Sequence, residues 1–203
     1  MNPVAAAFEL RAAMERLEPE PEHTGHVAFL AGRLFDELRP LHGLGAEDRV
    51  LLEGAACLHD IGWPESRRGT AHHKISARLI RKQTWQNLSQ SEVDIMAQTA
   101  RYHRRAHPSS EHGDFHRLAE PEKKRVLVLS AILRLADAFD RSHLQHVRDL
   151  RVRIDDHRVE VTLLSPTATD REIAAAGKKG QLAREVFERE FQVLFERLPG
   201  DPH

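Results

Sequence analysis

The chain has 203 residues, of which 40% are apolar and 30% are charged, and its formal net charge is −1. Such a composition excludes a disordered chain, and the balanced charge creates no field that would attract nucleic acid or a membrane surface. No apolar run approaches the roughly 18 residues that cross a bilayer. Charged residues also interrupt the N-terminal stretch in which a signal peptide would need an apolar core. Cys57 is the only cysteine, so an internal disulfide is excluded. We therefore expect a cytoplasmic protein without membrane or nucleic-acid partners.

Apolar residues recur with helical spacing through about two thirds of the chain. The pattern predicts helices over about 3–18, 23–38, 46–61, 70–83, 89–104 and 121–140. Gly62 and Pro64 should end the third helix, and Ser89 or Ser91 should cap the fifth. Pro, Gly and Ser break any period in the segment 105–120, which we expect to be a loop.

The periodicity changes in the last third of the chain. Apolar and polar residues alternate in "DLRVRIDDHRVEVTLL", residues 149–164, which predicts a β-hairpin with "DDH" as its turn. A lone hairpin is marginally stable in water, so we expect a final amphipathic helix over 171–197 to cover it. The predicted fold is mainly α: a helical bundle over 1–143, with 1–19 as its N-terminal helix, and a ββα appendage over 144–203.

Histidine is the unusual residue of this sequence, with 14 copies, and it is the commonest metal ligand in proteins. Three predicted helices carry polar residues on otherwise apolar faces: His26, the adjacent pair His59 and Asp60, and Asp137. Taken singly, each has a simpler explanation, either a hydrogen-bonded core histidine or a helix-end carboxylate paired with a nearby arginine. Together, two imidazoles and two carboxylates form a ligand set suited to Mn, Fe, Co, Ni, Zn or Mg. We expect these four residues to bind one or two divalent ions.

Three further histidines lie on faces that could join this site, namely His72, His73 and His103. They could bind a second ion or donate a proton to a substrate phosphate. The alternative for His72 and His73 is that one of them caps the start of its helix. Which of these two neighbours points into the site stays open at this point.

The order of these residues resembles a known family. A histidine on one helix, a His-Asp doublet on the next and a distant aspartate are similar to the HD-domain metal-dependent phosphohydrolases. More specifically, "AACLHDIG", "HHKISARLIRK", "RYHRR" and "AILRLADAFDRSH" look like the C-terminal HD-like region of the exopolyphosphatase/guanosine pentaphosphate phosphohydrolase (Ppx/GppA) family. The likeness spans about residues 20–197 and implies an HD-type helical domain with a metal site.

The resemblance has one important gap. Members of that family hydrolyse their substrate on an N-terminal actin-like domain, and this sequence lacks the glycine-rich phosphate loops of such a domain. Exopolyphosphatase activity is therefore not implied. Many members have lost HD ligands in this region, whereas this chain retains the set, which favours metal binding.

These observations favour an enzyme, a metal-dependent phosphohydrolase acting on a small phosphoester, nucleotide or polyphosphate-like substrate. The residues expected to be catalytic are Asp60, His72, His73 and His103. Lys74, Arg104 and Arg105 are candidate clamps for substrate phosphate oxygens, and the alternative for all three is simple exposure to solvent.

Two alternatives stay open. The chain could be a regulatory module that binds polyphosphate or a guanosine tetraphosphate-like ligand without cleaving it. It could also be a partner subunit of a separate actin-like phosphatase chain. A homodimer is compatible with all three hypotheses.

Overall fold

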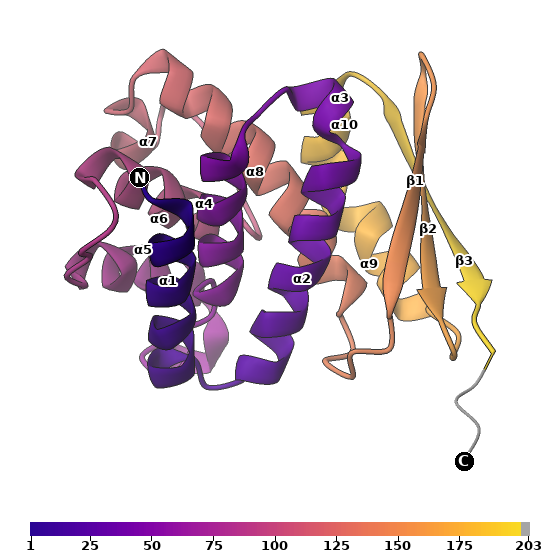
Figure 1. The fold of residues 1–203 in the computed structure, drawn as a ribbon, viewed down its shortest axis with the longest axis horizontal. Coiled ribbons are helices and arrows are strands. Elements are labelled where there is room, and N and C mark those ends of the chain that lie inside the picture. Colours follow the sequence, from indigo (N-terminus) through magenta and orange to yellow (C-terminus); the bar gives the residue numbers. More distant parts are fainter. Residues whose placement is uncertain (200–203) are drawn as a thin grey trace.

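Helices build the first two thirds of the chain in the computed structural model, which describes residues 1–199 (Figure 1). The longer helices are α1 (Pro3–Leu17), α2 (Pro21–Glu37), α4 (Ala46–Cys57), α5 (His72–Lys82), α6 (Gln90–Arg101), α8 (Glu120–Phe139), α9 (Asp170–Lys179) and α10 (Gln181–Phe187). Two single turns, α3 (Arg39–His42) and α7 (Gly113–His116), and a 3-10 turn over Arg67–Gly69 lie between them. The strands are β1 (Asp149–Ile154), β2 (Arg158–Ser165) and β3 (Glu190–Arg197). The mainly helical fold predicted from the sequence is confirmed.

Local capping explains where the helices begin. The Asn2 side chain accepts hydrogen bonds from the backbone of Val4 and Ala5 at the start of α1. Ser89 forms a capping box with Glu92 at the start of α6, which confirms the first of the two predicted caps. Such a cap typically contributes about 1 kcal/mol because it satisfies backbone donors that have no partner within the helix.

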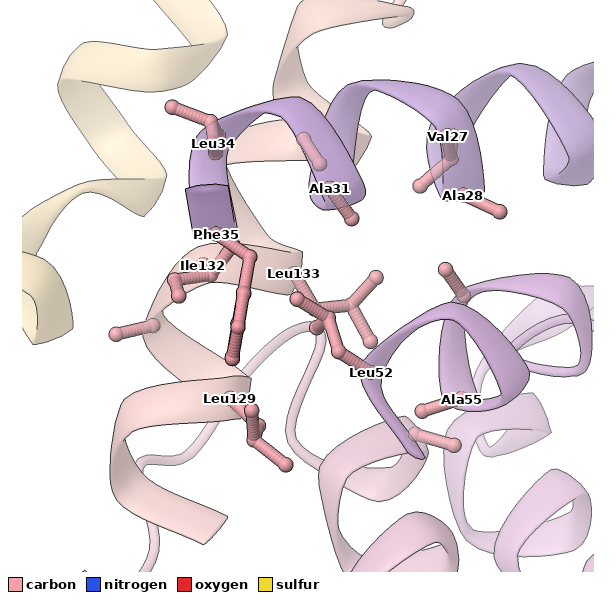
Figure 2. Packing of buried hydrophobic residues seen from close by; sticks show 14 of the residues in the cluster. Val27, Ala28, Ala31, Leu34, Phe35, Leu52, Ala55, Leu129, Ile132 and Leu133 are labelled. Carbon is pink, nitrogen blue, oxygen red and sulfur yellow. The ribbon is translucent and has the colours of Figure 1, made fainter. Parts of the chain in front are cut away.

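The core is centred on α8, which contacts α2, α4, α6, α9 and α10. Figure 2 shows side chains of α8 such as Leu129 and Leu133 packed against Phe35 of α2 and Leu52 of α4. All four are 2% exposed or less, and burying one such side chain stabilises the fold by about 1.5–3 kcal/mol. This packing fixes the C-terminal end of α8, which carries Asp137.

The C-terminal sheet has the strand order β1-β2-β3. Strands β1 and β2 form the predicted antiparallel hairpin, with Leu150 opposite Leu163, whereas β2 and β3 pair in parallel, with Val161 opposite Val193. Parallel neighbours need a crossover, and α9 and α10 provide it while packing on α8. The crossover brings the end of α9 close to the end of α8.

Two boundary predictions were wrong. The helix expected over 171–197 is instead α9, α10 and β3; the strand begins with apolar Phe191 and Val193 on either side of polar Gln192, the two-residue period of a strand. The helix expected over 46–61 ends at Cys57, so His59 and Asp60 lie in the turn that follows it. Among the described residues, no helix is both long and apolar enough to cross a membrane.

Candidate metal centre

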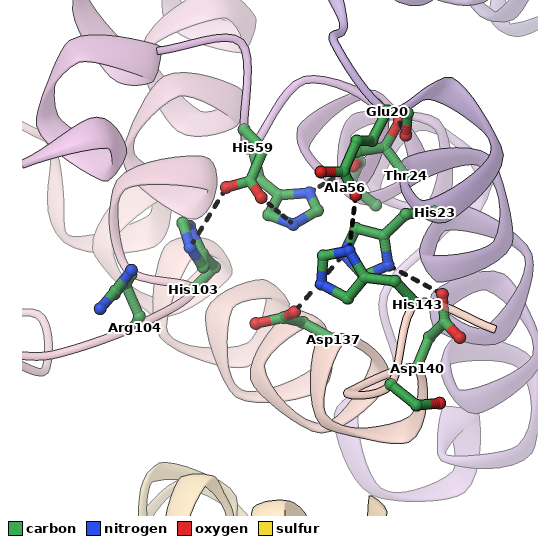
Figure 3. Close-up of polar contacts among 12 residues, drawn as sticks. Glu20, His23, Thr24, Ala56, His59, His103, Arg104, Asp137, Asp140 and His143 are labelled. Carbon is green, nitrogen blue, oxygen red and sulfur yellow. Dashed lines mark hydrogen bonds and ion pairs between the residues drawn. The ribbon is translucent and has the colours of Figure 1, made fainter. Parts of the chain in front are cut away.

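Six potential ligands from five segments meet between the ends of α2, α4, α5, α6 and α8. They form three overlapping groups, and within each group the candidate ligand atoms lie within 4.8 Å of one another. The groups are His23–His59–Asp60, His59–His103–Asp137 and Asp60–His72–His103. Figure 3 shows His23 between Asp137 and Asp140, with His59 nearby. Asp60 belongs to the first and third groups and therefore joins the two halves of the centre.

The turn that carries Asp60 is pressed against α5. The Gly62 amide donates to Ser76 Oγ at 3.0 Å, and a Cβ built on Gly62 would stand only 2.5 Å from the carbonyl oxygen of His72. Only glycine allows this approach. The contact places Asp60 Oδ1 3.1 Å from His72 Nε2.

Three of the histidines are held in the same orientation by the backbone. In each, Nδ1 lies 2.7–2.9 Å from the carbonyl oxygen three residues earlier. The pairs are His59 with Ala56, His72 with Gly69, and His103 with Ala100. A carbonyl can only accept, so Nδ1 must donate, and a neutral ring then carries its lone pair on Nε2. The backbone thus presents Nε2 as the ligand atom, as is typical of metal-binding histidines.

These lone pairs face one another. His72 Nε2 lies 3.2 Å from His103 Nε2, and with both Nδ1 atoms donating, two neutral rings would oppose lone pair to lone pair. Asp60 Oδ1 is 3.8 Å from His103 Nε2 and adds negative charge to the same place. A cation held between these atoms removes the repulsion.

His23 is oriented by a carboxylate instead. Its Nδ1 donates to Asp140 Oδ2 at 2.8 Å, which leaves Nε2 directed towards Asp137 Oδ1 at 3.9 Å. Within residues 1–199, neither His23 Nε2 nor His59 Nε2 has a hydrogen-bond partner, although both are buried. Buried polar atoms without partners are costly, and a metal ion is the ligand that satisfies a bare imidazole nitrogen beside carboxylates. These residues therefore fit a divalent metal ion.

His26 lies outside all three groups, whereas His23, one turn earlier on α2, belongs to the group with His59 and Asp60. His26 Nε2 is buried and has no hydrogen-bond partner among residues 1–199, the His26 ring stacks near Phe29, and burial lowers its pKa. Residues three apart on a helix share nearly the same face, so periodicity could not separate the two histidines. The two histidines differ in their position along α2, because His23 lies one turn closer to Asp137 than His26 does.

The two carboxylates at the centre are ionised. Burial acts to raise the pKa of Asp60, but the surrounding imidazoles of His59, His72 and His103 lower it well below its usual range. Burial likewise opposes ionisation of Asp137, and the ammonium of Lys179, which bonds to Asp137 Oδ2, lowers that pKa. Lys179 ends α9 and is a functional candidate that the sequence reasoning missed, because the predicted long helix gave its last turn no special place.

Glu18 supports the centre as a neutral acid. Its Oε1 accepts the Asp60 amide at 3.2 Å. Burial and the nearby Asp60 charge raise the pKa of Glu18 to about 9. Glu18 therefore positions the Asp60 turn without adding a negative charge at neutral pH. Nothing in its sequence context marked it, since it simply follows the end of α1.

His72, rather than His73, belongs to the ligand groups. His73 is 6% exposed, and burial together with the neighbouring His72 and Arg104 lowers its pKa to about 4. It is therefore neutral at pH 7. Lys74 is exposed and does not line the cavity beside the ligand groups, whereas Arg104 and Arg105 do.

That cavity has a volume of about 1040 Å³ and contains Asp60, His72, His103 and Asp137 in its lining. The rest of its wall is strongly cationic, with Arg68, Arg104, Arg141, Arg171, Lys178 and Lys179. Arg104 Nη1 reaches within 3.3 Å of His72 Nε2. The arrangement suits an anionic ligand placed next to the ligand groups.

Replacing each of the two α2 histidines with alanine tests the geometry directly. We expect His23→Ala to weaken divalent-metal binding by at least about tenfold, because a buried ligand atom is lost. His26→Ala should leave metal affinity within about twofold, since His26 belongs to none of the groups. Calorimetric titration with Mn²⁺ or Co²⁺ measures both. A larger loss in His26→Ala than in His23→Ala would contradict the assignment.

A family model described as Ppx/GppA phosphatase, domain III, matches residues 10–174. The match includes His23, His59, Asp60, His72, His103 and Asp137 and ends before Lys179. No curated protein matches the chain.

Proposed function

The chain belongs to the Ppx/GppA phosphatase domain III family, and on that premise we propose that it is a divalent-metal-dependent phosphohydrolase with an HD-type site. One observation supports the proposal: four buried imidazoles and two ionised carboxylates converge, and in His59, His72 and His103 a backbone bond to Nδ1 turns Nε2 towards the other candidate ligands. This donor set accepts Mn, Fe, Co, Ni, Zn or Mg.

The candidate ligands can be divided between two metal ions. His23, His59 and Asp60 would hold one ion, with Asp137 Oδ1 3.9 Å from His23 Nε2, and Asp60, His72 and His103 would hold a second. A bound divalent ion supplies Lewis acidity and lowers the pKa of water at the site.

The remaining side chains of the cavity act on the substrate. Arg104 and Lys179 contact His72 and Asp137 of the ligand groups, and in this proposal they bind phosphoryl oxygens. Charge developing on those oxygens would be stabilised by these fixed cations, which need no reorganisation. Trp63, with its ring centroid 4.9 Å from that of His72, covers one side of the site. The substrate we propose is a small phosphoester, nucleotide or polyphosphate-like molecule.

One contact favours a different function. The Lys179 ammonium bonds to Asp137 Oδ2 and thus neutralises a carboxylate that would otherwise serve a metal ion. A protein that used Lys179 in this way would bind a phosphate ligand in the cationic cavity without cleaving it. This non-catalytic module is our second candidate function.

Hydrolysis assays separate the two candidates. Untagged full-length protein is incubated with p-nitrophenyl phosphate, nucleotides and tripolyphosphate in the presence of Mn²⁺, Co²⁺, Ni²⁺ or Mg²⁺, and released phosphate is measured. We expect release that depends on metal and stops with chelator. Saturable binding of these compounds without product, with or without metal, would overturn the enzyme in favour of the binding module.

A further inference from the structure

A second cavity of about 460 Å³ lies beside the cavity that Asp60, His72, His103 and Asp137 line, which we call the metal cavity. The two cavities share Thr70, Arg104 and Arg105 in their walls, while Lys74, Arg101 and His112 line only the second. Within residues 1–199, none of the six residues of the ligand groups lines it. We call it the Lys74 cavity.

The Lys74 cavity is cationic throughout. Its wall contains Lys74, Arg101, Arg104 and Arg105 and no carboxylate. In the part of the chain that the structure describes, Lys74, Arg104 and Arg105 form no ion pair with a carboxylate, and the nearest pairing of Arg101 is a 3.8 Å contact with Asp114. Lys74, Arg104 and Arg105 thus bring like charges together without a paired carboxylate, and a bound anion offsets their mutual repulsion.

The backbone adds to this potential. The cavity lies at the N-terminal end of α5, where Thr70, Ala71 and His73 contribute to its wall, and a helix N-terminus carries partial positive charge. His73 is more than nine-tenths buried there, and its Nδ1 has no hydrogen-bond partner among residues 1–199. Arg105 is held in the left-handed region at φ 58° while its carbonyl accepts from Arg134 at 3.2 Å. The backbone that carries Arg105 is therefore held in place.

We propose that the Lys74 cavity is a second oxyanion site, which binds a phosphate group separately from the metal centre. Tetrahedral oxyanions with a charge near −2 match several guanidinium and ammonium donors at once. Arg104 stands between the two sites, since it lines both cavities and contacts His72. The phosphate is either a free ion or a more distant phosphoryl group of a substrate bound at the metal centre. The site stands independently of turnover.

Calorimetric titration of the full chain in chelator tests this site without any metal. Inorganic phosphate is the probe, at low ionic strength so that charge is not screened. We expect saturable binding that Lys74→Glu weakens by about tenfold and that the double variant Lys74→Glu/Arg105→Glu removes. Lys124→Glu, an exposed charge reversal at the start of α8 that lines neither cavity, is the matched control and should bind as the parent does.

Tripolyphosphate in the same chelated protein identifies the source of the phosphate. Binding at least about tenfold tighter than that of phosphate, and lost in Lys74→Glu, assigns the site to an extended substrate. Equal affinities for the two assign it to free phosphate.

A footprint on the unaltered protein guards against misfolded variants. Phosphate should protect Lys74, but not Lys124, from an amine-reactive ester, as read by mass spectrometry. The proposal fails if phosphate does not bind the chelated protein, if Lys74→Glu binds it as tightly as the parent, or if the two lysines are protected equally. None of these results would bear on hydrolysis at the metal centre.

Discussion

Replacing Asp60 with asparagine is expected to lower kcat/KM for phosphoester hydrolysis on the order of a thousandfold, or about 4 kcal/mol of transition-state stabilisation. Asp60 is the carboxylate shared by the group with His23 and His59 and the group with His72 and His103. Asparagine keeps the size and one oxygen but loses the charge that a divalent ion requires. The measurement is steady-state hydrolysis over a range of metal concentrations, together with metal affinity by calorimetry.

The matched control removes a carboxylate elsewhere. Asp156 is exposed in the turn between β1 and β2, and Asp156→Asn should leave kcat/KM within about twofold. Both variants should unfold at the temperature of the parent in chelator to within a few degrees, since neither change alters packing. An Asp60→Asn protein that keeps more than about a tenth of the parent activity at saturating metal would contradict the role of Asp60.

Arg134→Met is expected to destabilise the protein by about 3 kcal/mol or more, the largest loss of stability that we predict. Arg134 is 5% exposed on α8, and its guanidinium donates to the carbonyl oxygens of Tyr102 at 2.9 Å, Arg105 at 3.2 Å and Lys179 at 3.3 Å. Methionine preserves much of the aliphatic volume, but three carbonyls lose a charged donor. Each buried carbonyl oxygen left without a donor costs about 1–3 kcal/mol, and the cost is smaller where a water molecule replaces the lost hydrogen bond.

The same contacts connect Arg134 to the site. They anchor the segment after α6, which carries His103, and the end of α9, which carries Lys179. We therefore expect Arg134→Met to impair metal binding even under conditions where it remains folded. Urea unfolding compares it with Arg151→Met, whose side chain is 64% exposed in a pair with Glu196 and should cost less than about 1 kcal/mol. Equal losses for the two variants would show that Arg134 is not a structural anchor.

The helical part of the fold could be predicted from sequence because its core faces are regular. The spacing that places Leu129 and Leu133 on α8 also leads to Asp137, a carboxylate that local pattern alone marks as unusual. The end of the chain misled the same reasoning. A run of α9, α10 and β3 contains enough charged and apolar residues to imitate one amphipathic helix, and only the alternation from Phe191 onwards indicates a strand.

The candidate site could be predicted by residue type but not in detail. The doublet of His59 and Asp60 was found because it interrupts an apolar run, and the structure places both in ligand groups. The choice between His23 and His26 depends on the distance to Asp137, which is a tertiary quantity. Lys179 approaches the site only because the parallel pairing of β2 and β3 brings α9 back onto α8. No local pattern contains that information.

Elemental analysis of untagged full-length protein, purified without chelator and passed through gel filtration, tests the metal centre most directly. The untagged protein is essential because an added histidine tag would bind metal itself. Our account predicts one or two equivalents of a divalent metal per chain, falling by at least about tenfold in Asp60→Asn and unchanged in Asp156→Asn. A parent protein that retains no more metal than Asp60→Asn, even after incubation with Mn²⁺, Co²⁺, Ni²⁺ or Zn²⁺, would contradict it.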